Sequence, residues 1–388
     1  MAAALFLCGC SEKNNSKQEQ TDSAAAQMSQ AAKADSAFSI PAPQGNPLEN
    51  APGRMKNGMI IAGEGSEIRA FTPFHSGEGV SRAYIKLINE FRDVFPDVNL
   101  YAAVIPGQAA YYVPKMVADK SNPMKPAFDY LKANLHPSIK YIDVYNILAG
   151  HTKEPIYSRT DHHWAPLGAY YVAEALANAA GVPFKDLSNY DKHVVHGYVG
   201  SMFHYTGEQA IKDNPEDFYY YTPKGTNEKT TFIPYNKNKE TGAISEGKPY
   251  QGQFFRHYDD GAGGAYCAFM GGDHFIVKVE TGVPNGRRLL IIKDSHGNPI
   301  PAYLFHSFEE IHVIDYRYFL KNLKQYVADN KISDILLAFG INTSSGSGNM
   351  QKVRDFITQT PVKQSQGTSS SDNAEEPRDS KKKADKKK

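Results

Sequence analysis

Three short segments of the chain carry side chains whose chemistry suits acyl transfer. Residues 161–164 have the sequence Asp-His-His-Trp and place a carboxylate beside two imidazoles, just before a predicted helix. In acyl transfer, a carboxylate holds one imidazole nitrogen so that the other nitrogen can take the proton of a hydroxyl. Asp161, His162 and His163 therefore suit a catalytic relay or a metal site. The plainer alternative is that Asp161 caps the helix and the histidines lie on the surface.

The other two segments follow predicted apolar strands. Residues 288–293 lead into Asp294 and Ser295, so the serine is expected at the edge of a sheet, where backbone N–H groups of the next turn can bind an oxyanion. Residues 334–339 lead into a Gly-x-Asn sequence that ends at Asn342, whose amide can donate to developing negative charge. Taken alone, each segment is equally compatible with ordinary caps and turns.

An alternation of strands and helices is predicted to position these segments. Apolar runs predict short strands within 57–71 around a turn at 63–65, and longer strands over 98–105, 289–293, 311–314 and 334–339. Helical spacing and end signals predict helices over 81–95, 166–180, 299–308, 317–329 and 348–358. This alternation favours a three-layer α/β/α domain with a mostly parallel sheet, in which ligands gather beyond the carboxyl ends of the strands.

Composition narrows the function classes. Lys and Arg number 43 against 42 Asp and Glu, a formal net charge of +1, which argues against a body that binds nucleic acid. A hydrophobic share of 41% can build a large core. The 3 cysteines stand at positions 8, 10 and 267, so the body has no internal disulfide framework or cysteine-rich zinc site.

Residues 190–285, rich in aromatic and turn residues, are expected to form a β-rich insertion: a lid, an acceptor-binding element or a cover for a sheet edge.

Together, the three segments resemble the blocks of the SGNH hydrolase superfamily: a strand ending in Asp-Ser, a strand ending in Gly-x-Asn, and an Asp-and-His loop before a helix. Here the Asp-and-His block precedes the serine block. That permuted order, with the sequence Thr-Asp-His-His-Trp, resembles the DHHW protein family and its relatives, the SGNH-like alginate O-acetylation proteins. Further segments similar to the family lie at 97–101, 271–273, 293–298 and 314–319.

The resemblance implies a role for each matching residue. Ser295 would be the nucleophile, His163 the base and Asp161 the carboxylate that orients the base. Asn342 would donate to the oxyanion, and the backbone N–H groups of Gly271 and Gly272 are further candidate donors.

Four other residues are candidates with open alternatives. His162 and Trp164 would flank the substrate, with Trp164 stacking on a sugar or serving as a packing anchor. Arg317 would bind a carboxylated substrate or pair with Asp315. The sequence Asp273-His274 offers another Asp–His pair, so Asp273 is an alternative triad acid.

The reaction expected from this resemblance is transfer of an acetyl group to a cell-envelope or exported polysaccharide, through an acyl-Ser295 intermediate and without a cofactor. If water takes the acyl group, the protein is a carbohydrate esterase. Two rival classes stay open: a metal-dependent phosphoesterase that uses Asp161, His162, His163, Asp273 and His274 as ligands, and a non-catalytic polysaccharide-binding or assembly lipoprotein.

The two ends of the chain suggest how it is located. Residues 1–10 resemble a truncated lipoprotein signal, in which Cys10 would be lipidated, and residues 11–53 have the composition of a disordered tether. Residues 54–362 are predicted to be the catalytic domain, and 363–388 a disordered Lys-rich tail. We therefore expect a periplasmic or outer-membrane lipoprotein of the bacterial cell envelope. The family resemblance adds the expectation of a membrane-bound O-acyltransferase as partner.

Overall fold

The computed structural model describes residues 38–77, 81–273 and 275–359. Its strands are β1 Gly53–Lys56, β2 Met59–Ala62, β3 Arg69–Phe71, β4 Asn99–Ile105, β5 Lys140–Tyr141, β6 Tyr190–Tyr198, β7 Glu216–Pro223, β8 Lys229–Lys237, β9 Ile244–Glu246, β10 Tyr250–Gly252, β11 Phe275–Glu280, β12 Arg288–Lys293, β13 Glu310–Asp315 and β14 Asp334–Gly340. Its α-helices are α2 Arg82–Val94, α3 Lys125–Asn134, α4 Val144–Ala149, α5 Pro166–Ala180, α6 Met202–Thr206, α7 Gln209–Asp213, α8 Leu323–Asp329, α9 Ile341–Ser345 and α10 Ser347–Thr358.

A nine-stranded mixed sheet forms the centre of the fold. Its order is β10-β8-β11-β13-β12-β14-β4-β5, and β9 pairs with β8. Strands β13, β12, β14, β4 and β5 pair in parallel, whereas β11, β8, β10 and β9 are joined to the sheet by antiparallel pairings. The expected parallel pairing is therefore present in one part of the sheet, and the other part is antiparallel.

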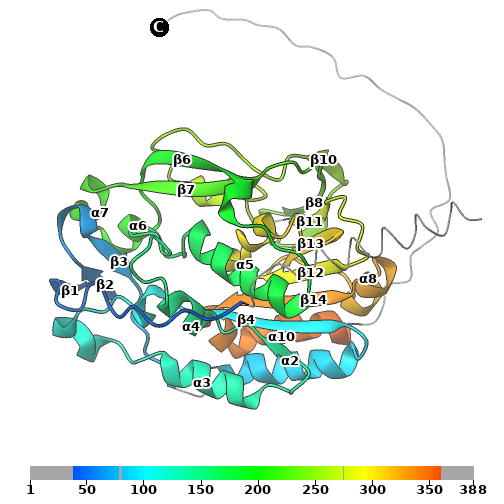
Figure 1. The fold of residues 1–388 in the computed structure, drawn as a ribbon, viewed down its shortest axis with the longest axis horizontal. Helices are drawn as coiled ribbons and strands as arrows, with labels where there is room; N and C mark the ends of the chain where they lie inside the picture. Colours follow the sequence, from blue (N-terminus) through cyan, green and yellow to red (C-terminus); the bar gives the residue numbers. More distant parts are fainter. Residues whose placement is uncertain (1–37, 78–80, 274, 360–388) are drawn as a thin grey trace, which may run out of the picture.

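The parallel strands are the ones that carry the predicted functional segments. Every residue of β14 is buried, and Leu289–Ile292 of β12 are fully inaccessible, as expected of strands covered on both faces. In Figure 1, helix α5 lies on one side of β4 and β14, and helices α2, α3 and α10 lie on the other side. This packing holds the carboxyl ends of β12 and β14 next to each other, because the two strands are paired in register from Leu289 with Asp334.

Two predicted helices are much shorter than expected. Residues 299–308 form only a 3-10 turn at Ile300–Tyr303, and Pro301 disfavours the α-helical conformation of Ile300 before it. The helix predicted over 317–329 begins at Leu323, where the Asn322 side chain accepts the N–H of Gln325. The other predicted strands and helices are confirmed within a few residues.

Residues 190–285 contribute to two different sheets. Strands β6 and β7 form a separate antiparallel pair, seen at the top of Figure 1, whereas β8, β10 and β11 extend the central sheet from β13. The region thus contains strands, as predicted, but four of its six strands, β8 to β11, continue the main sheet. No helix in the described part of the chain is both long and apolar enough to cross a bilayer.

Candidate active site

Ser295 lies where β12 gives way to a tight turn. The chain leaves β12 at Lys293 and enters a 3-10 turn at Ser295–Gly297, which the Asp294 carboxylate caps by accepting the N–H of His296 at 3.0 Å. A side chain at Gly297 would clash with Lys293, since its Cβ would lie 2.5 Å from the Lys293 Cβ. The tight turn therefore places Ser295 at the carboxyl edge of the sheet, where the sequence predicts it.

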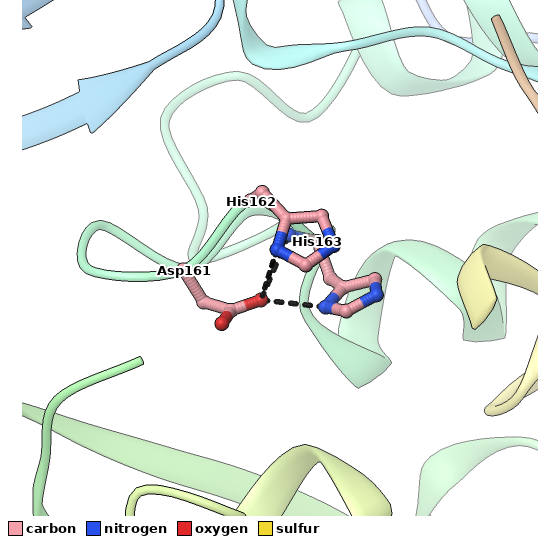
Figure 2. A group of neighbouring side chains, drawn as sticks. All are labelled: Asp161, His162 and His163. Atoms are coloured by element: carbon pink, nitrogen blue, oxygen red, sulfur yellow. Dashed lines mark hydrogen bonds and ion pairs between the residues drawn. The ribbon is translucent and has the colours of Figure 1, made fainter. Parts of the chain in front are cut away.

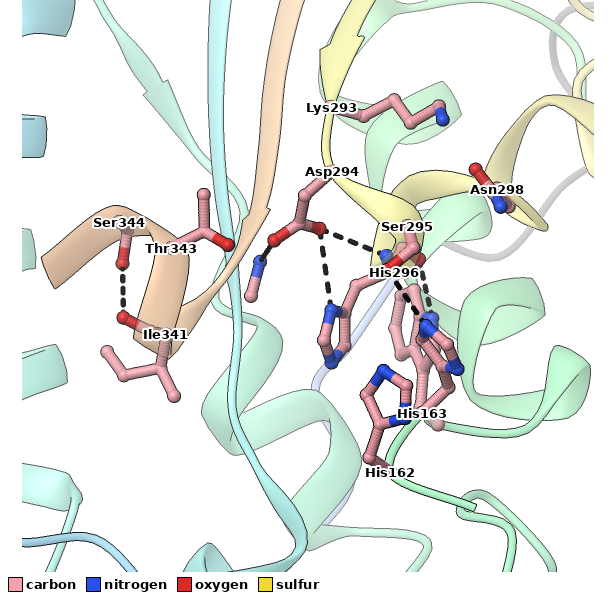
Figure 3. Close-up of polar contacts among 12 residues, drawn as sticks. His162, His163, Lys293, Asp294, Ser295, His296, Asn298, Ile341, Thr343 and Ser344 are labelled. Carbon is pink, nitrogen blue, oxygen red and sulfur yellow. Dashed lines mark hydrogen bonds and ion pairs between the residues drawn. The ribbon is translucent and has the colours of Figure 1, made fainter. Parts of the chain in front are cut away.

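The structure brings Ser295, His163 and Asp161 into one hydrogen-bonded chain. His163 Nε2 is 2.9 Å from Ser295 Oγ, and His163 Nδ1 is 2.6 Å from Asp161 Oδ1 (Figures 2 and 3). Asp161 Oδ1 also accepts the backbone N–H of His163 at 2.9 Å. Both Asp161 and His163 are buried. This is the arrangement in which an imidazole can take a proton from a serine hydroxyl while a carboxylate fixes its orientation.

Two residues that the sequence did not single out complete the surroundings of this triad. The Ser201 backbone N–H donates to Asp161 Oδ2 at 2.8 Å, just before helix α6. The Tyr266 ring stacks on the His163 ring with centroids 3.8 Å apart, and its hydroxyl donates to the Ser295 carbonyl at 2.9 Å. Tyr266 belongs to the region predicted as an insertion, where its position in an aromatic-rich stretch was the only available signal.

The protonation states suit a general base. Burial acts to raise the pKa of the Asp161 carboxyl, but the hydrogen bond and charge interaction with His163 outweigh it and hold that pKa well below its usual range. Burial lowers the pKa of His163, although Asp161 opposes this effect. Asp161 is therefore ionised, and His163 is kept in the neutral form that can accept a proton.

Asp161, His162 and His163 also form the one group of potential metal ligands among the described residues (Figure 2). One ligand atom from each lies within 4.8 Å of the others. One nitrogen of each histidine already has a hydrogen-bond partner, because His163 Nδ1 faces Asp161 and His162 Nδ1 lies 2.6 Å from the Ser201 hydroxyl. The contacts therefore fit an acid–base relay better than a metal centre. His274, a further ligand of the metal hypothesis, lies outside the described residues.

A small cavity of about 80 Å³ lies beside the triad, on the side of strand β14. His162, His296 and Asn342 contribute to its lining, together with the side chains of Phe71, Thr72, Pro73, Ile105, Gln108, Met124, Ile341 and Thr343. Asn342, the second residue of helix α9, is exposed and lines this cavity. Burial and the neighbouring His163 lower the pKa of His162 to about 4, so its ring is neutral at physiological pH.

Gly271 and Gly272 lie in a loop whose backbone conformation suits glycine. Their φ angles are 71° and 129°, which favour glycine. Asp273, which follows them, lies 3.0 Å from Lys293 Nζ and 2.8 Å from Asn298 Nδ2. This anchors the loop to the strand end that carries Ser295.

Three residues for which the sequence left alternatives open make well-defined contacts in the structure. Trp164 is fully buried and donates from Nε1 to the His296 carbonyl at 2.7 Å, so its ring packs in the core and has no face accessible to a sugar. Arg317 is paired with Asp315 and Asp273, each 2.7 Å from Nη2, so its guanidinium is occupied by structural partners. The carboxylate beside His163 belongs to Asp161, not to Asp273, whose charge is balanced by Lys293 and Arg317.

Comparisons with known proteins agree with this fold. The model of the DHHW protein family matches residues 65–314. A DHHW family protein from Eubacterium siraeum is 34% identical in sequence, with a TM-score of 0.68, over 77% of this chain and 96% of that one. PatB1 of Bacillus cereus, solved with a sulfonyl adduct, is 19% identical with a TM-score of 0.56, over 76% of this chain and 97% of that one.

A weaker similarity links the chain to the O-acetyltransferase domain of Pseudomonas putida AlgJ, at 13% identity and a TM-score of 0.39, over 76% of this chain and 92% of that one. None of the curated protein sequences matches the chain. The family model covers well over half of the chain, and the Eubacterium siraeum protein is aligned over nearly its whole length. The chain therefore belongs to the DHHW family.

Proposed function

We propose that this protein is a serine acyltransferase, with Ser295 as nucleophile, His163 as general base and Asp161 as the orienting carboxylate. The observation that carries the proposal is the unbroken contact from Asp161 Oδ1 through both nitrogens of His163 to Ser295 Oγ, at 2.6 and 2.9 Å. A carboxylate, an imidazole and a hydroxyl in contact in this order can activate the hydroxyl as a nucleophile for acyl transfer. The proposed catalytic domain is residues 54–362, with a three-layer arrangement like that of SGNH-like enzymes; the helices on both sides of β4 and β14 support this arrangement.

The reaction runs in two steps. His163 takes the proton of Ser295, Ser295 Oγ attacks the carbonyl carbon of the acyl donor, and the donor's leaving group departs with the proton from His163. In the second step, His163 takes the proton of an acceptor hydroxyl, whose oxygen attacks the acyl carbon and releases Ser295. Asn342 and the N–H groups of Gly271 and Gly272 are the proposed donors to the oxyanion, and one such donor is typically worth about 3 kcal/mol of transition-state stabilisation.

The proposed acceptor is a glycan of the cell envelope or an exported polysaccharide, and the proposed acyl group is acetyl. One exposed aromatic side chain supports a sugar acceptor. Tyr205 of helix α6 is 52% exposed, and its ring lies edge to face against that of His162, with centroids 6.1 Å apart. Tyr205 thus offers, at the rim of the site, the stacking surface that buried Trp164 cannot offer.

A carbohydrate esterase, in which water replaces the acceptor, uses the same triad and is the second candidate function. We also propose that the protein is located in the cell envelope. A lipid anchor at Cys10, which lies outside the described residues, would tether the domain in the cell envelope, and a membrane-bound O-acyltransferase would supply the acetyl group.

The test is intact-mass analysis of the protein after incubation with 4-nitrophenyl acetate or an aryl sulfonyl fluoride. We expect a single adduct that maps to Ser295 and is lost in Ser295→Ala and His163→Ala. Ser138→Ala is a matched control, because Ser138 Oγ also contacts a histidine, His136 Nδ1 at 2.7 Å, but is exposed and far from Asp161 in sequence. An adduct retained in Ser295→Ala would contradict the assignment, and an unreactive wild-type protein would favour a non-catalytic glycan-binding role.

A further inference from the structure

A second aspartate–histidine pair lies on the other side of the nucleophile. Asp294 and His296 flank Ser295 in the sequence, and the Asp294 carboxylate lies 3.4 Å from Nδ1 of the His296 ring while accepting that residue's backbone N–H at 3.0 Å (Figure 3). The other carboxylate oxygen accepts the Gly340 N–H at 3.0 Å. Asp294 is buried, and His296 lowers the pKa of its carboxyl against the effect of burial. The pair is therefore an ionised carboxylate fixed beneath an imidazole.

The His296 ring packs against Gly340, where a larger residue would not fit. A Cβ atom on Gly340 would lie 2.8 Å from His296 Nδ1 and 2.9 Å from its Cε1, so the ring packs directly on the backbone of β14. On the main-chain side, Trp164 Nε1 donates to the His296 carbonyl at 2.7 Å. Strand β14, the Asp294 carboxylate and Trp164 together fix the ring in one place without using its Nε2 atom.

The free edge of this imidazole belongs to the cavity beside the triad. The His296 side chain is 19% exposed and contributes to the cavity lining with His162 and Asn342. Nδ1 is inaccessible and lies 3.4 Å from Asp294 Oδ1 without a hydrogen bond, and Nε2 likewise has no hydrogen-bond partner within residues 38–77, 81–273 and 275–359. The ring centroid lies 5.1 Å from that of His163. Two imidazoles, one of them the general base, thus stand side by side at the nucleophile.

We propose that His296 binds the acceptor, and that it selects an acceptor with two neighbouring hydroxyl groups. The Asp294 carboxylate, 3.4 Å from Nδ1, favours the tautomer that carries its proton on Nδ1, and in that tautomer Nε2 of His296 is a hydrogen-bond acceptor. One hydroxyl of a vicinal diol gives its proton to His163 and attacks the acyl carbon, while the neighbouring hydroxyl donates a hydrogen bond to His296 Nε2. The inference rests on the proposed function and deepens it by naming the acceptor chemistry.

The atoms balance without a second catalytic base. The bond that forms joins the attacking oxygen to the acyl carbon, and the bond that breaks joins that carbon to Ser295 Oγ. The proton of the attacking hydroxyl passes to His163 Nε2 and then to Ser295 Oγ. His296 gains and loses no proton, so its contribution is to hold the acceptor and exclude geometries in which the wrong oxygen faces the acyl carbon.

The experiment measures what fraction of the acetyl groups on Ser295 is transferred to an added alcohol and what fraction to water. The probes are cis-cyclohexane-1,2-diol and cyclohexanol, which share a ring and differ in the second hydroxyl. The wild-type protein is expected to prefer the diol by roughly fivefold to tenfold, the effect of one neutral hydrogen bond. His296→Phe keeps the ring shape and is expected to abolish that preference, measured as the ratio of transfer to the diol over transfer to cyclohexanol; His296→Gln, whose amide reaches the Nε2 position, is expected to restore part of it.

The outcomes separate this inference from the proposed function. If the acetyl-enzyme forms but the wild-type protein does not distinguish the two alcohols, the role of His296 is wrong and the triad assignment stands. A His296→Phe protein that slows acetylation and both transfers to the same extent points to a structural role and also overturns the inference. If no acetyl adduct forms on Ser295, the proposed function fails and the inference falls with it. The wild-type comparison decides the question even if His296→Phe does not fold.

Discussion

One oxygen atom of Asp161, Oδ1, contacts His163 twice: it accepts the backbone N–H at 2.9 Å and lies 2.6 Å from the ring nitrogen Nδ1. Because Asp161 and His163 are two residues apart, the backbone contact closes a short turn. The same carboxylate therefore fixes the backbone of residues 161–163 and the orientation of the His163 ring. The histidine tautomer is thereby fixed with Nε2 free to accept a proton from Ser295, 2.9 Å away.

The first prediction concerns the negative charge of the Asp161 carboxylate. Asp161→Asn keeps an oxygen that can accept from the backbone but removes the carboxylate that stabilises the protonated imidazole. We expect acylation of Ser295 to slow by roughly 10³- to 10⁴-fold, the loss seen when a triad aspartate is amidated. Stopped-flow release of 4-nitrophenol measures the rate. A loss of tenfold or less would show that Asp161 is not the residue that orients the base.

The second prediction concerns the glycine against which Asp161 packs. A Cβ atom at Gly200 would lie 2.4 Å from both Cβ and Oδ2 of Asp161, so Gly200→Ala must displace the carboxylate. A displacement of about 1 Å costs roughly 10²-fold in rate, and we expect acylation to fall by that order.

Gly348→Ala is the control for this substitution, because nothing lies within 4 Å of its Cβ position on helix α10. It should leave the acylation rate unchanged and raise the free energy of unfolding by about 0.5–1 kcal/mol. Equal rates in Gly200→Ala and wild type would contradict the packing argument.

The third prediction concerns pH. Burial lowers the pKa of His163 below its ordinary value of 6.5, so the acylation rate should stay constant down to about that pH and fall only under more acidic conditions. The pKa of His162 is about 4 in the folded protein against 6.5 in the unfolded chain. Between these values the unfolded chain binds a proton that the folded protein does not, so the stability should fall as the pH drops from about 6.5 to 4.

Thermal unfolding measured across this pH range tests the stability part of the prediction. His162→Gln has no titrating group at this position, and its unfolding temperature should depend less on pH than that of the wild type. An identical pH dependence would show that His162 is not one of the groups responsible.

The fourth prediction concerns the buried lysine below the nucleophile. Lys293 is 2% exposed and lies 3.0 Å from Asp273 and 3.1 Å from Asp315, which is itself inaccessible. Lys293→Met leaves two carboxylates with only Arg317 as a cation, and we expect a loss of about 3–5 kcal/mol in the free energy of unfolding. Urea titration measures it. Lys125→Met removes an exposed pair with Asp129 and should cost less than about 1 kcal/mol.

The fifth prediction concerns the exposed ring at the rim of the site. Tyr205→Ala should raise the KM for an oligosaccharide acceptor by roughly tenfold and leave kcat and the acylation of Ser295 unchanged, because stacking binds the ground state and the transition state alike. Tyr250→Ala, which removes a ring of similar exposure from edge strand β10, is the control. Equal effects of the two substitutions would argue against a role for Tyr205 in acceptor binding.

The sequence by itself was enough for the family, the type of fold and most of the strands near the site. Apolar runs such as residues 289–292 predict buried strands because every side chain in them avoids water, and the Asp-His-His-Trp sequence identifies the DHHW family. Two helices are predicted too long, because helical spacing includes neither the restriction that Pro301 places on Ile300 nor the cap at Asn322.

Only the tertiary structure decided what surrounds each candidate residue. His163 and Ser295 are 132 positions apart, and their contact depends on how helix α5 and strand β12 pack, which no local pattern encodes. The same packing buries Trp164, pairs Asp273 with Lys293, and places Tyr266, Ser201 and His296 around the triad. Local periodicity shows which face of an element is apolar, but the partner of a buried polar group depends on which distant segments meet there.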